Sequence, residues 1–543
     1  MPDASDRSVR PQYTPDLRDP APDPFVWLLG LVTDGLANRL MAALVVYAAM
    51  RTSVASASKS FWYDEVCTVI VARLPTVTTI WRGLKQGIDG MAPLYYFVAR
   101  LADHLVPNEN IAFRIPSIAG LCCVLVCVFL FVRKRSGSVI ALICVPIPFV
   151  TILYTTYAEE ARPYSLVVAF VAIALLAYQH APSTLWMLLM GFSLAIAVSL
   201  HYYAIFALVP FFAAEAALVL WAGRLRLRVW LALACGCLPL WVFWPLSSKL
   251  REYYGAHFWA SVSLTDVLRT YGALFNTTAE LGFTPVAVSG TLGVAAVIVL
   301  VLALLAAIVP MLRRVREDLT ASKLFSENIL VLGMLALPVF IVVGVLVAHG
   351  GMAPRYALCT VLGLPLALGI VLPSLDRKAV ALVMIFIFAG LAVQEAGFWR
   401  SWLGPLPGGV ASATGVKNFI ESVGYKDLPV VESDGFDYLK IQYYSSPEWK
   451  ERFFVLTDAP NAVAYAGTDS IDKQLLIFQR FVPLHVSDFK VFASSHPRFL
   501  LYSTGGAPFD WWPVRLNREG YLLQLLNAEG AQKVYLVSAK GDQ

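Results

Sequence analysis

Charged residues are scarce in this chain of 543 residues: Asp, Glu, Lys and Arg make up 15% of it, whereas 58% is hydrophobic. A soluble domain has about 25% charged and about 45–50% apolar residues. The composition, with a mean hydropathy of +0.66, excludes an ordinary soluble protein and predicts a multi-pass membrane protein. The net charge of +5 does not indicate a nucleic-acid partner, because the basic residues fall in short clusters between apolar runs. That arrangement is typical of membrane topology.

The chain also lacks the spacings that signal a metal or nucleotide site. No Cys-x-x-Cys or His-rich motif is present, and most of the eight cysteines lie in or beside apolar runs, where they act as small hydrophobic residues. No Gly-x-Gly-x-x-Gly or P-loop motif supports nucleotide binding. We therefore assign no cofactor. A divalent metal near the acidic residues described below stays open, since no ligand spacing demands one.

Long apolar runs, by contrast, are plentiful. Residues 1–25 are rich in Pro, Asp and Arg without an apolar core, so we expect a disordered cytoplasmic tail there rather than a signal peptide. A helix needs about 20 residues to cross a bilayer. This criterion predicts about eleven spans, near residues 41–57, 112–132, 138–157, 163–180, 184–201, 204–222, 229–247, 286–309, 329–348, 356–373 and 379–398.

Basic clusters set the predicted orientation. The connections after the second, sixth, eighth and tenth spans carry Arg133-Lys134-Arg135, Arg224/Arg226/Arg228, Arg313/Arg314/Arg316 and Arg377-Lys378. Positively charged connections stay in the cytoplasm. We therefore expect a cytoplasmic N-terminus, the inner (plasma) membrane as the location, and an extracytoplasmic C-terminal region.

The composition changes along the chain and predicts its domains. We expect a transmembrane domain over residues 26–403, a linker rich in Pro and Gly at 404–410 and an extracytoplasmic domain at 411–543. The first outer loop, 58–111, is too weakly apolar to cross and is expected to form interfacial helices. The last domain alternates helical and extended segments, which predicts a small α/β domain with a mainly parallel sheet. Within it, residues 514–526 are expected to be extended or a hairpin.

Nearly every polar motif at a helix end falls on the predicted outer face. The motifs contain Asp64, Glu65, Glu159, Glu160, Arg162, Tyr164, His201, Tyr202, Lys249, Arg251 and Arg355. Each also has a plainer interpretation: acids at a loop start face water, and an arginine beside a span can anchor it by snorkelling. Glu159 is an acid–base partner, a metal ligand or a helix-end charge. His201 is a donor contact or an interfacial histidine.

Acids, arginines and aromatics at the outer edge of a bilayer suit the transfer of a group from a lipid-phosphate donor. A guanidinium binds phosphate with two parallel hydrogen bonds, and a carboxylate can take a proton from an attacking hydroxyl. A phosphate leaves readily when its charge is stabilised. Arg162 and Arg355 are the first candidates to hold that phosphate, and Lys249 and Arg251 are the next.

Six short motifs occur in order along residues 40–400. They are Asp64-Glu65, Ala92-Pro93-Leu94-Tyr95-Tyr96, Phe113-Arg114-Ile115-Pro116-Ser117, Glu160-Ala161-Arg162-Pro163-Tyr164, His201-Tyr202 and Arg355-Tyr356. The ordered set resembles the GT-C glycosyltransferases, in the branch of the dolichyl-phosphate-mannose protein mannosyltransferases and aminoarabinose transferases. Ala92 departs from the usual proline of that branch.

The resemblance implies roles for the motif residues. Asp64 would be the catalytic base, and Glu65 would bind the acceptor or support the base. Arg162 and Arg355 would hold the donor phosphate, and Tyr95 would belong to the site. The implied enzyme is mannosyltransferase-like and acts in the cell envelope. It would move a hexosyl or pentosyl group, with inversion, from a polyprenyl-phosphate sugar to a hydroxyl or phosphate of a glycan, lipid or protein.

The alternative is a transporter or flippase for lipid-linked substrates, without transferase activity. Such a protein places ionisable residues near the bilayer midplane, along broken helices or inverted repeats. Here the middles of the predicted spans are almost free of charge, and no internal repeat is visible. A structural scaffold would leave the clustered acids and arginines unexplained.

Reporter fusions test the predicted orientation. A reporter joined at Gly404 should lie outside and one inserted within residues 310–328 should lie inside, because three predicted spans separate the two sites. A phosphatase that is active only outside the cytoplasm should therefore be active at Gly404 alone. Equal activity at both positions would contradict the topology.

Overall fold

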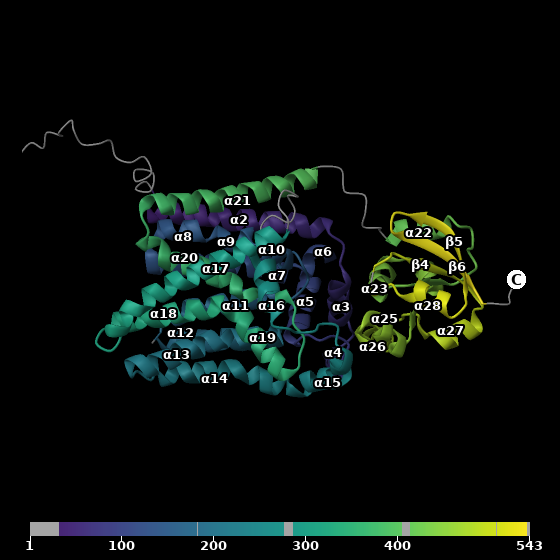
Figure 1. Cartoon of the computed structure of the whole chain (residues 1–543), viewed down its shortest axis with the longest axis horizontal. Helices are drawn as coiled ribbons and strands as arrows, with labels where there is room; N and C mark the ends of the chain where they lie inside the picture. The colour runs from purple at the N-terminus through teal and green to yellow at the C-terminus, as the bar shows by residue number, and fades with distance from the viewer. Residues whose placement is uncertain (1–31, 182, 276–285, 404–412, 507, 540–543) are drawn as a thin grey trace, which may run out of the picture.

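The computed structural model describes residues 32–181, 183–275, 286–403, 413–506 and 508–539. The predicted tail at 1–25 and the predicted linker at 404–410 lie outside these residues. The described chain forms a helical part that ends at Leu403 and a part from Ala413 onward that contains a six-stranded sheet. Figure 1 shows long helices side by side, with the sheet part against one end of them. The prediction of a helical multi-pass membrane protein with a small C-terminal α/β domain is confirmed.

Six helical stretches in the described residues are long and apolar enough to cross a membrane. Three of them are single helices: α2 (Asp34–Ser58), α7 (Ile115–Ser136) and α21 (Arg377–Leu403). The other three join consecutive elements. Tyr202–Ala222 consists of η1 (Tyr202–Leu208) and α13 (Val209–Ala222); Gly293–Arg313 runs from within α17 (Val286–Ile308) through η3 (Val309–Arg313); and Pro354–Ser374 consists of η4 (Pro354–Leu362), α20 (Gly363–Val371) and η5 (Leu372–Ser374). Two shorter apolar helices are α11 (Tyr164–Gln179) and α12 (Thr184–Leu200). The number of eleven spans stays a prediction.

Three further stretches qualify as spans only when two helices joined by a bend are counted as one, which differs from the straight spans predicted. They are α8 (Ser138–Cys144) and α9 (Pro146–Val150) with α10 (Ile152–Ala158), bent by 71°; α14 (Leu227–Val242) with α15 (Trp244–Tyr254) and η2 (Gly255–His257), bent by 50°; and α18 (Leu319–Leu335) with α19 (Leu337–Ala348), bent by 61°. Pro245 and Pro338 stand in the first turns of α15 and α19. A proline has no backbone N–H to continue the preceding helix, so that helix ends before it.

The segment between α2 and α7 folds into short helices. They are α3 (Tyr63–Ala72), α4 (Val77–Gln86), α5 (Leu94–Leu105) and α6 (Glu109–Ala112). Helices are predicted here, and their position in the membrane interface stays a prediction. The first turn of α3 carries Asp64 and Glu65, because carboxylates are stabilised at the positive end of a helix. Glu65 also accepts a hydrogen bond of 3.2 Å from the backbone N–H of Trp62.

Helices α7 and α11 approach each other closely near their N-terminal ends. A Cβ atom on Gly120 would lie 2.7 Å from the carbonyl carbon of Ser165, so the crossing requires a glycine. Ser117 Oγ donates to the carbonyl of Arg162 at 2.8 Å, and Ser165 Oγ donates to the carbonyl of Ser117 at 2.7 Å. These contacts hold the segment that carries Arg162 against the start of α7.

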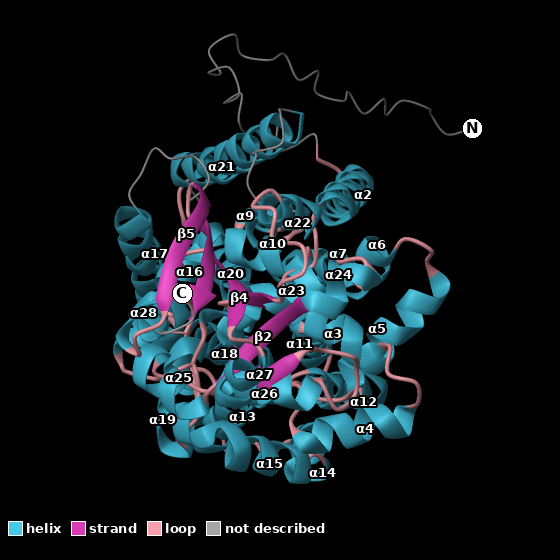
Figure 2. Ribbon diagram, turned by 90° about the vertical axis from the view of Figure 1, so that its right-hand side faces the viewer, coloured by secondary structure: helices cyan, strands magenta, loops and turns pink. Residues whose placement is uncertain are grey.

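The C-terminal sheet has the strand order β3-β2-β1-β4-β6-β5 (Figure 2). Its strands are β1 (Val430–Glu432), β2 (Phe453–Thr457), β3 (Val486–Asp488), β4 (Arg498–Ser503), β5 (Leu522–Glu529) and β6 (Gln532–Ser538). Strand β1 is parallel to β2 and β4, and β2 is parallel to β3. Strand β6 is antiparallel to both β4 and β5. The predicted mainly parallel sheet is therefore present, with an antiparallel hairpin at one edge.

Alternate strand residues belong to two separate apolar clusters, because successive side chains point to opposite faces of a sheet. Val430 and Leu500 pack in a cluster that continues into the core of the membrane part. Val431 and Leu501 pack in a second cluster, which is confined to the C-terminal domain. The helices of this domain are α22 (Ala413–Glu421), α23 (Gly435–Tyr444), α24 (Pro447–Arg452), α25 (Ala459–Ala466), α26 (Ser470–Phe478), α27 (Phe489–Ser495) and α28 (Trp512–Arg518).

The expectation for residues 514–526 is wrong over its first residues, which belong to α28. Trp512 and Leu516 are four residues apart, and both are buried in the second apolar cluster. That spacing places them on one face of a helix. The extended part begins at Leu522, in β5.

The C-terminal domain docks on the short helices that carry the acidic pair. The ring of Phe436, in α23, lies 4.7 Å from that of Tyr63, in α3, and Tyr444 Oη accepts a hydrogen bond of 2.8 Å from the backbone N–H of Phe61. On α26, the ammonium of Lys473 donates to the carbonyl of Tyr253 at 2.9 Å. The domain therefore contacts the start of α3 and the end of α15 together.

A single amide in this interface bridges two segments of the membrane part. Gln474, in α26, accepts a hydrogen bond of 2.8 Å from Tyr63 Oη and donates one of 3.0 Å to the carbonyl of Ile88. Tyr63 directly precedes Asp64, and Ile88 directly precedes Asp89. One side chain of the C-terminal domain thus holds the backbone beside both carboxylates.

We expect Gln474→Ala to loosen both segments. The substitution removes the hydrogen bonds with Tyr63 and Ile88, each worth about 0.5–1.5 kcal/mol net, and a longer one from Gln474 to Cys67 Sγ, of 3.9 Å. Amide hydrogen exchange should therefore become faster at residues 61–67 and 86–91. The matched control is Gln524→Ala, because Gln524 is exposed on β5. Unchanged exchange in Gln474→Ala would show that the amide does not hold these segments.

Candidate active site

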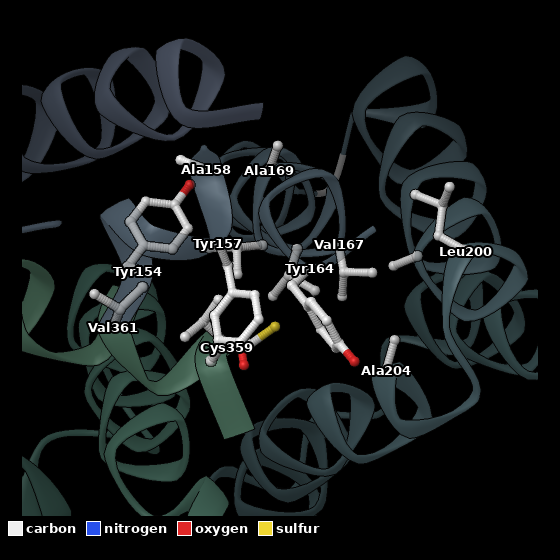
Figure 3. Packing of buried hydrophobic residues seen from close by; sticks show 14 of the residues in the cluster. Tyr154, Tyr157, Ala158, Tyr164, Val167, Ala169, Leu200, Ala204, Cys359 and Val361 are labelled. Carbon is white, nitrogen blue, oxygen red and sulfur yellow. The ribbon is translucent and has the colours of Figure 1, made fainter. Parts of the chain in front are cut away.

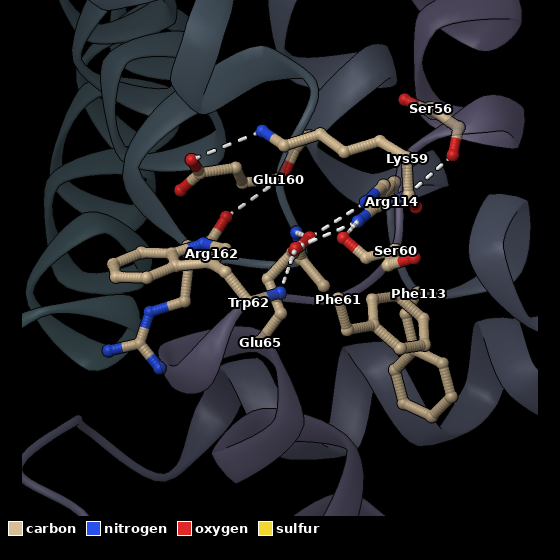
Figure 4. Close-up of polar contacts among 12 residues, drawn as sticks. Ser56, Lys59, Ser60, Phe61, Trp62, Glu65, Phe113, Arg114, Glu160 and Arg162 are labelled. Atoms are coloured by element: carbon tan, nitrogen blue, oxygen red, sulfur yellow. Dashed lines mark hydrogen bonds and ion pairs between the residues drawn. The ribbon is translucent and has the colours of Figure 1, made fainter. Parts of the chain in front are cut away.

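The carboxylate of Glu65 is buried in a bidentate ion pair with Arg114, at the start of α7 (Figure 4). Nε and Nη2 of Arg114 each lie 2.7 Å from one carboxylate oxygen, and both side chains are fully buried. The backbone N–H of Ala161 donates to the same carboxylate at 2.6 Å. Both oxygens of Glu65 are thus held by groups of the protein itself.

The remaining donors of Arg114 reach the end of α2 and the residues that follow it. Nη1 donates to the carbonyls of Ser56 at 2.5 Å and Lys59 at 2.7 Å, and Nη2 donates to that of Ser60 at 3.2 Å. All five N–H donors of this guanidinium are therefore satisfied. A buried ion pair is favourable only when its remaining hydrogen-bonding groups find partners, and this one meets that condition.

Asp64 belongs to a different group of side chains. Its Oδ2 lies 3.8 Å from Nη2 of Arg162 and 3.8 Å from Nη2 of Arg355. The guanidinium of Arg162 points away from the pair of Glu65 and Arg114 (Figure 4). These three residues come from the start of α3, the turn before α11 and the start of η4. The structure thus brings together Asp64, Arg162 and Arg355, which are far apart in the sequence.

A second carboxylate, Asp89, belongs to this group and was missed by the sequence analysis. Its Oδ2 lies 3.4 Å from Nη1 of Arg162, and its side chain is almost fully buried. The same Nη1 donates to the carbonyl of Asp64 at 2.9 Å and to Thr68 Oγ1 at 3.1 Å. A usable signal was present, because Asp89 stands three residues before the motif that begins at Ala92, on the same predicted outer loop.

Arg355 is positioned by aromatic rings and by a glycine. Its guanidinium lies 5.1 Å from the ring centre of Trp259 and 5.6 Å from that of Tyr356, at distances typical of cation–π contacts. A Cβ atom on Gly351 would lie 2.6 Å from the carbonyl oxygen of Ala260. Only glycine allows the segment that contains Trp259 to pack so closely on the loop before Arg355.

Both arginines keep unused donors. The buried Nε atoms of Arg162 and Arg355 have no hydrogen-bond partner in the part of the chain that the structure describes. The contacts of 3.8 Å with Asp64 are longer than hydrogen bonds. A buried donor without a partner is costly, so an anion between the two guanidinium groups would be stabilised here.

Aromatic side chains line a cavity beside Arg355. Tyr164, His201, Tyr203 and Tyr356 form its polar side, and Val167, Val168, Leu337, Ile341 and Leu358 are among its apolar residues. The rings of Tyr164 and His201 lie 5.2 Å apart, and those of Tyr203 and Tyr356 lie 4.3 Å apart. Figure 3 shows Tyr157 and Tyr164 side by side with their hydroxyl groups directed to the same side. The lining of the cavity thus combines polar aromatic groups with aliphatic side chains.

Two titratable groups in the connections around the site have shifted pKa values. Burial, together with the positive charges of Arg162 and Arg355, lowers the pKa of His201 to about 3, so its ring is neutral at physiological pH. Burial raises the pKa of Glu160 to about 7, although Lys59 opposes the shift. The Nζ atom of Lys59 lies 3.5 Å from Oε1 of Glu160 (Figure 4).

Three other candidates lie outside the group around Asp64. Glu159 is paired with Arg51, in α2. Lys249 is exposed and lies 2.5 Å from Glu252, and Arg251 is exposed on the same helix. Among the described residues, neither cation of α15 has an ion pair with Asp64 or Asp89.

Two tyrosines complete the predicted set. Tyr95 is buried, and its hydroxyl donates to the carbonyl of Phe113 at 3.5 Å, beside the start of α7. The buried hydroxyl of Tyr202 has no partner among the residues that the structure describes. Within those residues, no group of three or more His, Cys, Asp or Glu side chains could hold a metal ion.

Solved structures share this fold. ArnT from Cupriavidus metallidurans in the apo state is 12% identical and matches with a TM-score of 0.57, over 92% of this chain and 98% of that chain. ArnT from the same organism bound to undecaprenyl phosphate matches with a TM-score of 0.53 at 12% identity and the same coverage. No protein-family model matches the chain, and no curated protein does. The resemblance to the GT-C glycosyltransferases predicted from the motifs is thus confirmed for the fold.

We expect Glu65→Gln to unfold at a markedly lower temperature than the wild type, because removing one charge from a buried ion pair costs about 3–5 kcal/mol. Asp64→Asn should change the unfolding temperature little, since both of its guanidinium contacts are as long as 3.8 Å. Thermal unfolding of the purified protein in detergent measures both effects. The double variant Glu65→Gln/Arg114→Gln should lose less stability than the sum of the single losses. Additive losses would show that the pair is not coupled.

Proposed function

We propose that this chain is a membrane glycosyltransferase that uses a polyprenyl-phosphate sugar as its donor. It would move a hexosyl or pentosyl group to a hydroxyl or phosphate of a glycan, lipid or protein acceptor on the extracytoplasmic face. One observation carries the proposal: Asp64 lies 3.8 Å from both Arg162 and Arg355. A carboxylate between two arginines joins a proton acceptor to two phosphate-binding groups at one place.

Arg162 and Arg355 would hold the donor phosphate. Each has a buried Nε without a partner among the described residues, and a guanidinium binds phosphate best through two parallel N–H groups. Their contacts with the carboxylate of Asp64 are longer than hydrogen bonds, so an arriving phosphate can recruit the arginines without breaking a hydrogen bond to that carboxylate. As the bond between the sugar and the phosphate breaks, negative charge grows on the phosphate, and the two cations stabilise it.

Asp64 would act as the general base. The acceptor oxygen attacks the anomeric carbon and forms the new glycosidic bond, while the bond from that carbon to the phosphate oxygen breaks. The acceptor proton passes to the carboxylate of Asp64, and the electron pair of the broken bond leaves with the polyprenyl phosphate. A single displacement of this kind inverts the anomeric configuration.

The surroundings of the two arginines suit a lipid-linked phosphate. The lining of the cavity beside Arg355 includes tyrosine hydroxyl groups and aliphatic residues such as Leu337 and Ile341. The first units of a polyprenyl chain are apolar and adjoin the phosphate, so they would contact these aliphatic residues. ArnT, which shares the fold, has been seen bound to undecaprenyl phosphate, and this also supports the proposed donor.

Glu65 and Asp89 would be positioning residues in this scheme. Every oxygen of Glu65 is held by Arg114 or by backbone N–H groups, which argues against a direct role in proton transfer. Asp89 lies 3.4 Å from Nη1 of Arg162, and it would orient that guanidinium. Glu160, with a pKa near 7, stays a candidate proton carrier near the site.

Asp64→Asn should reduce transfer about a hundredfold or more while donor binding persists, because the amide keeps the shape but accepts no proton. The measurement is sugar transfer from a panel of polyprenyl-phosphate sugars in liposomes, with donor retention followed separately. Asp427→Asn is the matched control, because Asp427 is exposed in the C-terminal domain. Wild-type turnover by a folded Asp64→Asn protein would exclude the proposed base.

The same assay tests the arginines. Arg162→Lys and Arg355→Lys keep the charge but lose the paired N–H groups, so both should weaken donor use. If the arginines only anchored helix ends, lysine would serve equally well. Arg269→Lys is the control, because that side chain is 75% exposed. A protein that moves intact donor across the bilayer without cleaving it would instead be a transporter.

A further inference from the structure

A second cavity in the helical part is lined by residues at the helix ends away from the C-terminal domain, and these helix ends lie at the left of Figure 1. It has a volume of about 760 Å³. The start of α2, the end of α7, the end of α11 and the start of α12 surround it. The proposed glycosyl transfer uses none of its residues.

Two cations line this cavity without a carboxylate partner. Arg133 donates to the amide oxygen of Asn38 at 2.7 Å, and Lys134 donates to the carbonyl of Gln179 at 3.3 Å. Neither forms an ion pair within the part of the chain that the structure describes. Their neighbour Arg135, by contrast, pairs with Glu327 at 3.1 Å. Asp34 also lines the cavity, where its carboxylate accepts a hydrogen bond from Ser138 Oγ. Two cations against one carboxylate leave a net positive charge, which suits an anionic ligand.

Two aromatic side chains also line the cavity. The rings of His180 and Trp186 are stacked, 4.3 Å apart and 18° from parallel. Nδ1 of His180 contacts the carbonyl of Leu176 at 2.8 Å, which leaves Nε2 for a ligand. Trp186 adjoins Leu185, which is 74% exposed on α12. The lining thus combines basic and aromatic side chains, and the helix that carries Trp186 also exposes large apolar side chains.

We propose that this cavity binds the phosphate head group of an anionic phospholipid. A phosphodiester is the anion that enters from the membrane side with acyl chains attached, and Arg and Lys at helix ends bind such head groups. The guanidinium of Arg133 supplies directional N–H groups, and the ammonium of Lys134 supplies a point charge. The acyl chains would lie along the exposed leucines of α2 and α12, such as Leu40 and Leu188.

A soluble phosphate offers the same chemistry, and the position of the cavity decides between the two sources. The cavity lies between two helices that carry exposed apolar side chains, where a lipid reaches it by lateral diffusion. A soluble ion would gain nothing from Trp186 or from those leucines. The ligand class is therefore a lipid whose head group carries the phosphate.

Native mass spectrometry of the full-length protein in detergent tests the proposal. Phosphatidylglycerol and phosphatidylcholine with identical acyl chains are the probes. The wild type should retain phosphatidylglycerol at least about tenfold better, a difference of about 1.4 kcal/mol. Both lipids offer the same phosphate, but Arg133 and Lys134 repel the quaternary ammonium of choline. Equal retention of the two lipids by the wild type would overturn the proposal without the need for any variant.

Variants then locate the site. The double variant Arg133→Gln/Lys134→Gln should retain phosphatidylglycerol no better than phosphatidylcholine. Arg313→Gln/Arg314→Gln removes the same charge from exposed residues in the connection between α17 and α18, and it should behave like the wild type. An equal loss in both double variants would mean general charge attraction and would overturn the assignment.

A charge-preserving variant and a competition with a soluble phosphate complete the test. Arg133→Lys keeps the charge and should show an intermediate loss, while thermal unfolding confirms that each variant is folded. Glycerol 3-phosphate added in large excess should not displace the lipid. Displacement by this soluble phosphate would instead assign the cavity to a water-soluble ligand and contradict the lipid proposal.

Discussion

The buried ion pair between Glu65 and Arg114 is the contact on which the end of the membrane part beside the C-terminal domain depends. Transferring two charges out of water costs several kcal/mol for each ion. That cost is offset here because Arg114 uses all five of its donors and Glu65 accepts from four N–H groups. One pair of side chains thereby joins the end of α2, the start of α3, the start of α7 and the residue before Arg162. Asp64 directly precedes Glu65, and Arg162 directly follows Ala161, whose backbone N–H donates to Glu65.

The group around Asp64 differs from that pair in its electrostatics. Two carboxylates, Asp64 and Asp89, face two guanidinium groups, Arg162 and Arg355, so the formal charges balance. The separations of 3.4–3.8 Å are looser than the 2.7 Å contacts of Arg114, and donor atoms remain unused. A tight, fully satisfied pair suits a structural role, whereas a loose and balanced group can exchange partners when an anion arrives. Two adjacent acids in the sequence therefore have separate physical roles.

The C-terminal domain takes part in positioning the site. It contributes none of the charged residues around Asp64, but Phe436 packs on Tyr63, and Gln474 binds both Tyr63 and Ile88. Because Tyr63 and Ile88 directly precede the two carboxylates, the docking of the domain is coupled to the geometry of the site. This coupling acts through direct contacts of Phe436 and Gln474 with the residues that precede the two carboxylates.

The sequence by itself determined the class of the protein, the helical segments of its membrane part and the residues most able to bind a phosphate. Apolar composition and length suffice for the first two, because water excludes such segments whatever their partners. Residue type and order along the chain pointed to Asp64, Arg162 and Arg355. Only the tertiary structure decided that these three meet, that Glu65 is occupied by Arg114, that Asp89 joins the group, and that Glu159, Lys249 and Arg251 do not. Those outcomes depend on side-chain direction and on contacts between segments many residues apart, and neither is encoded in local spacing.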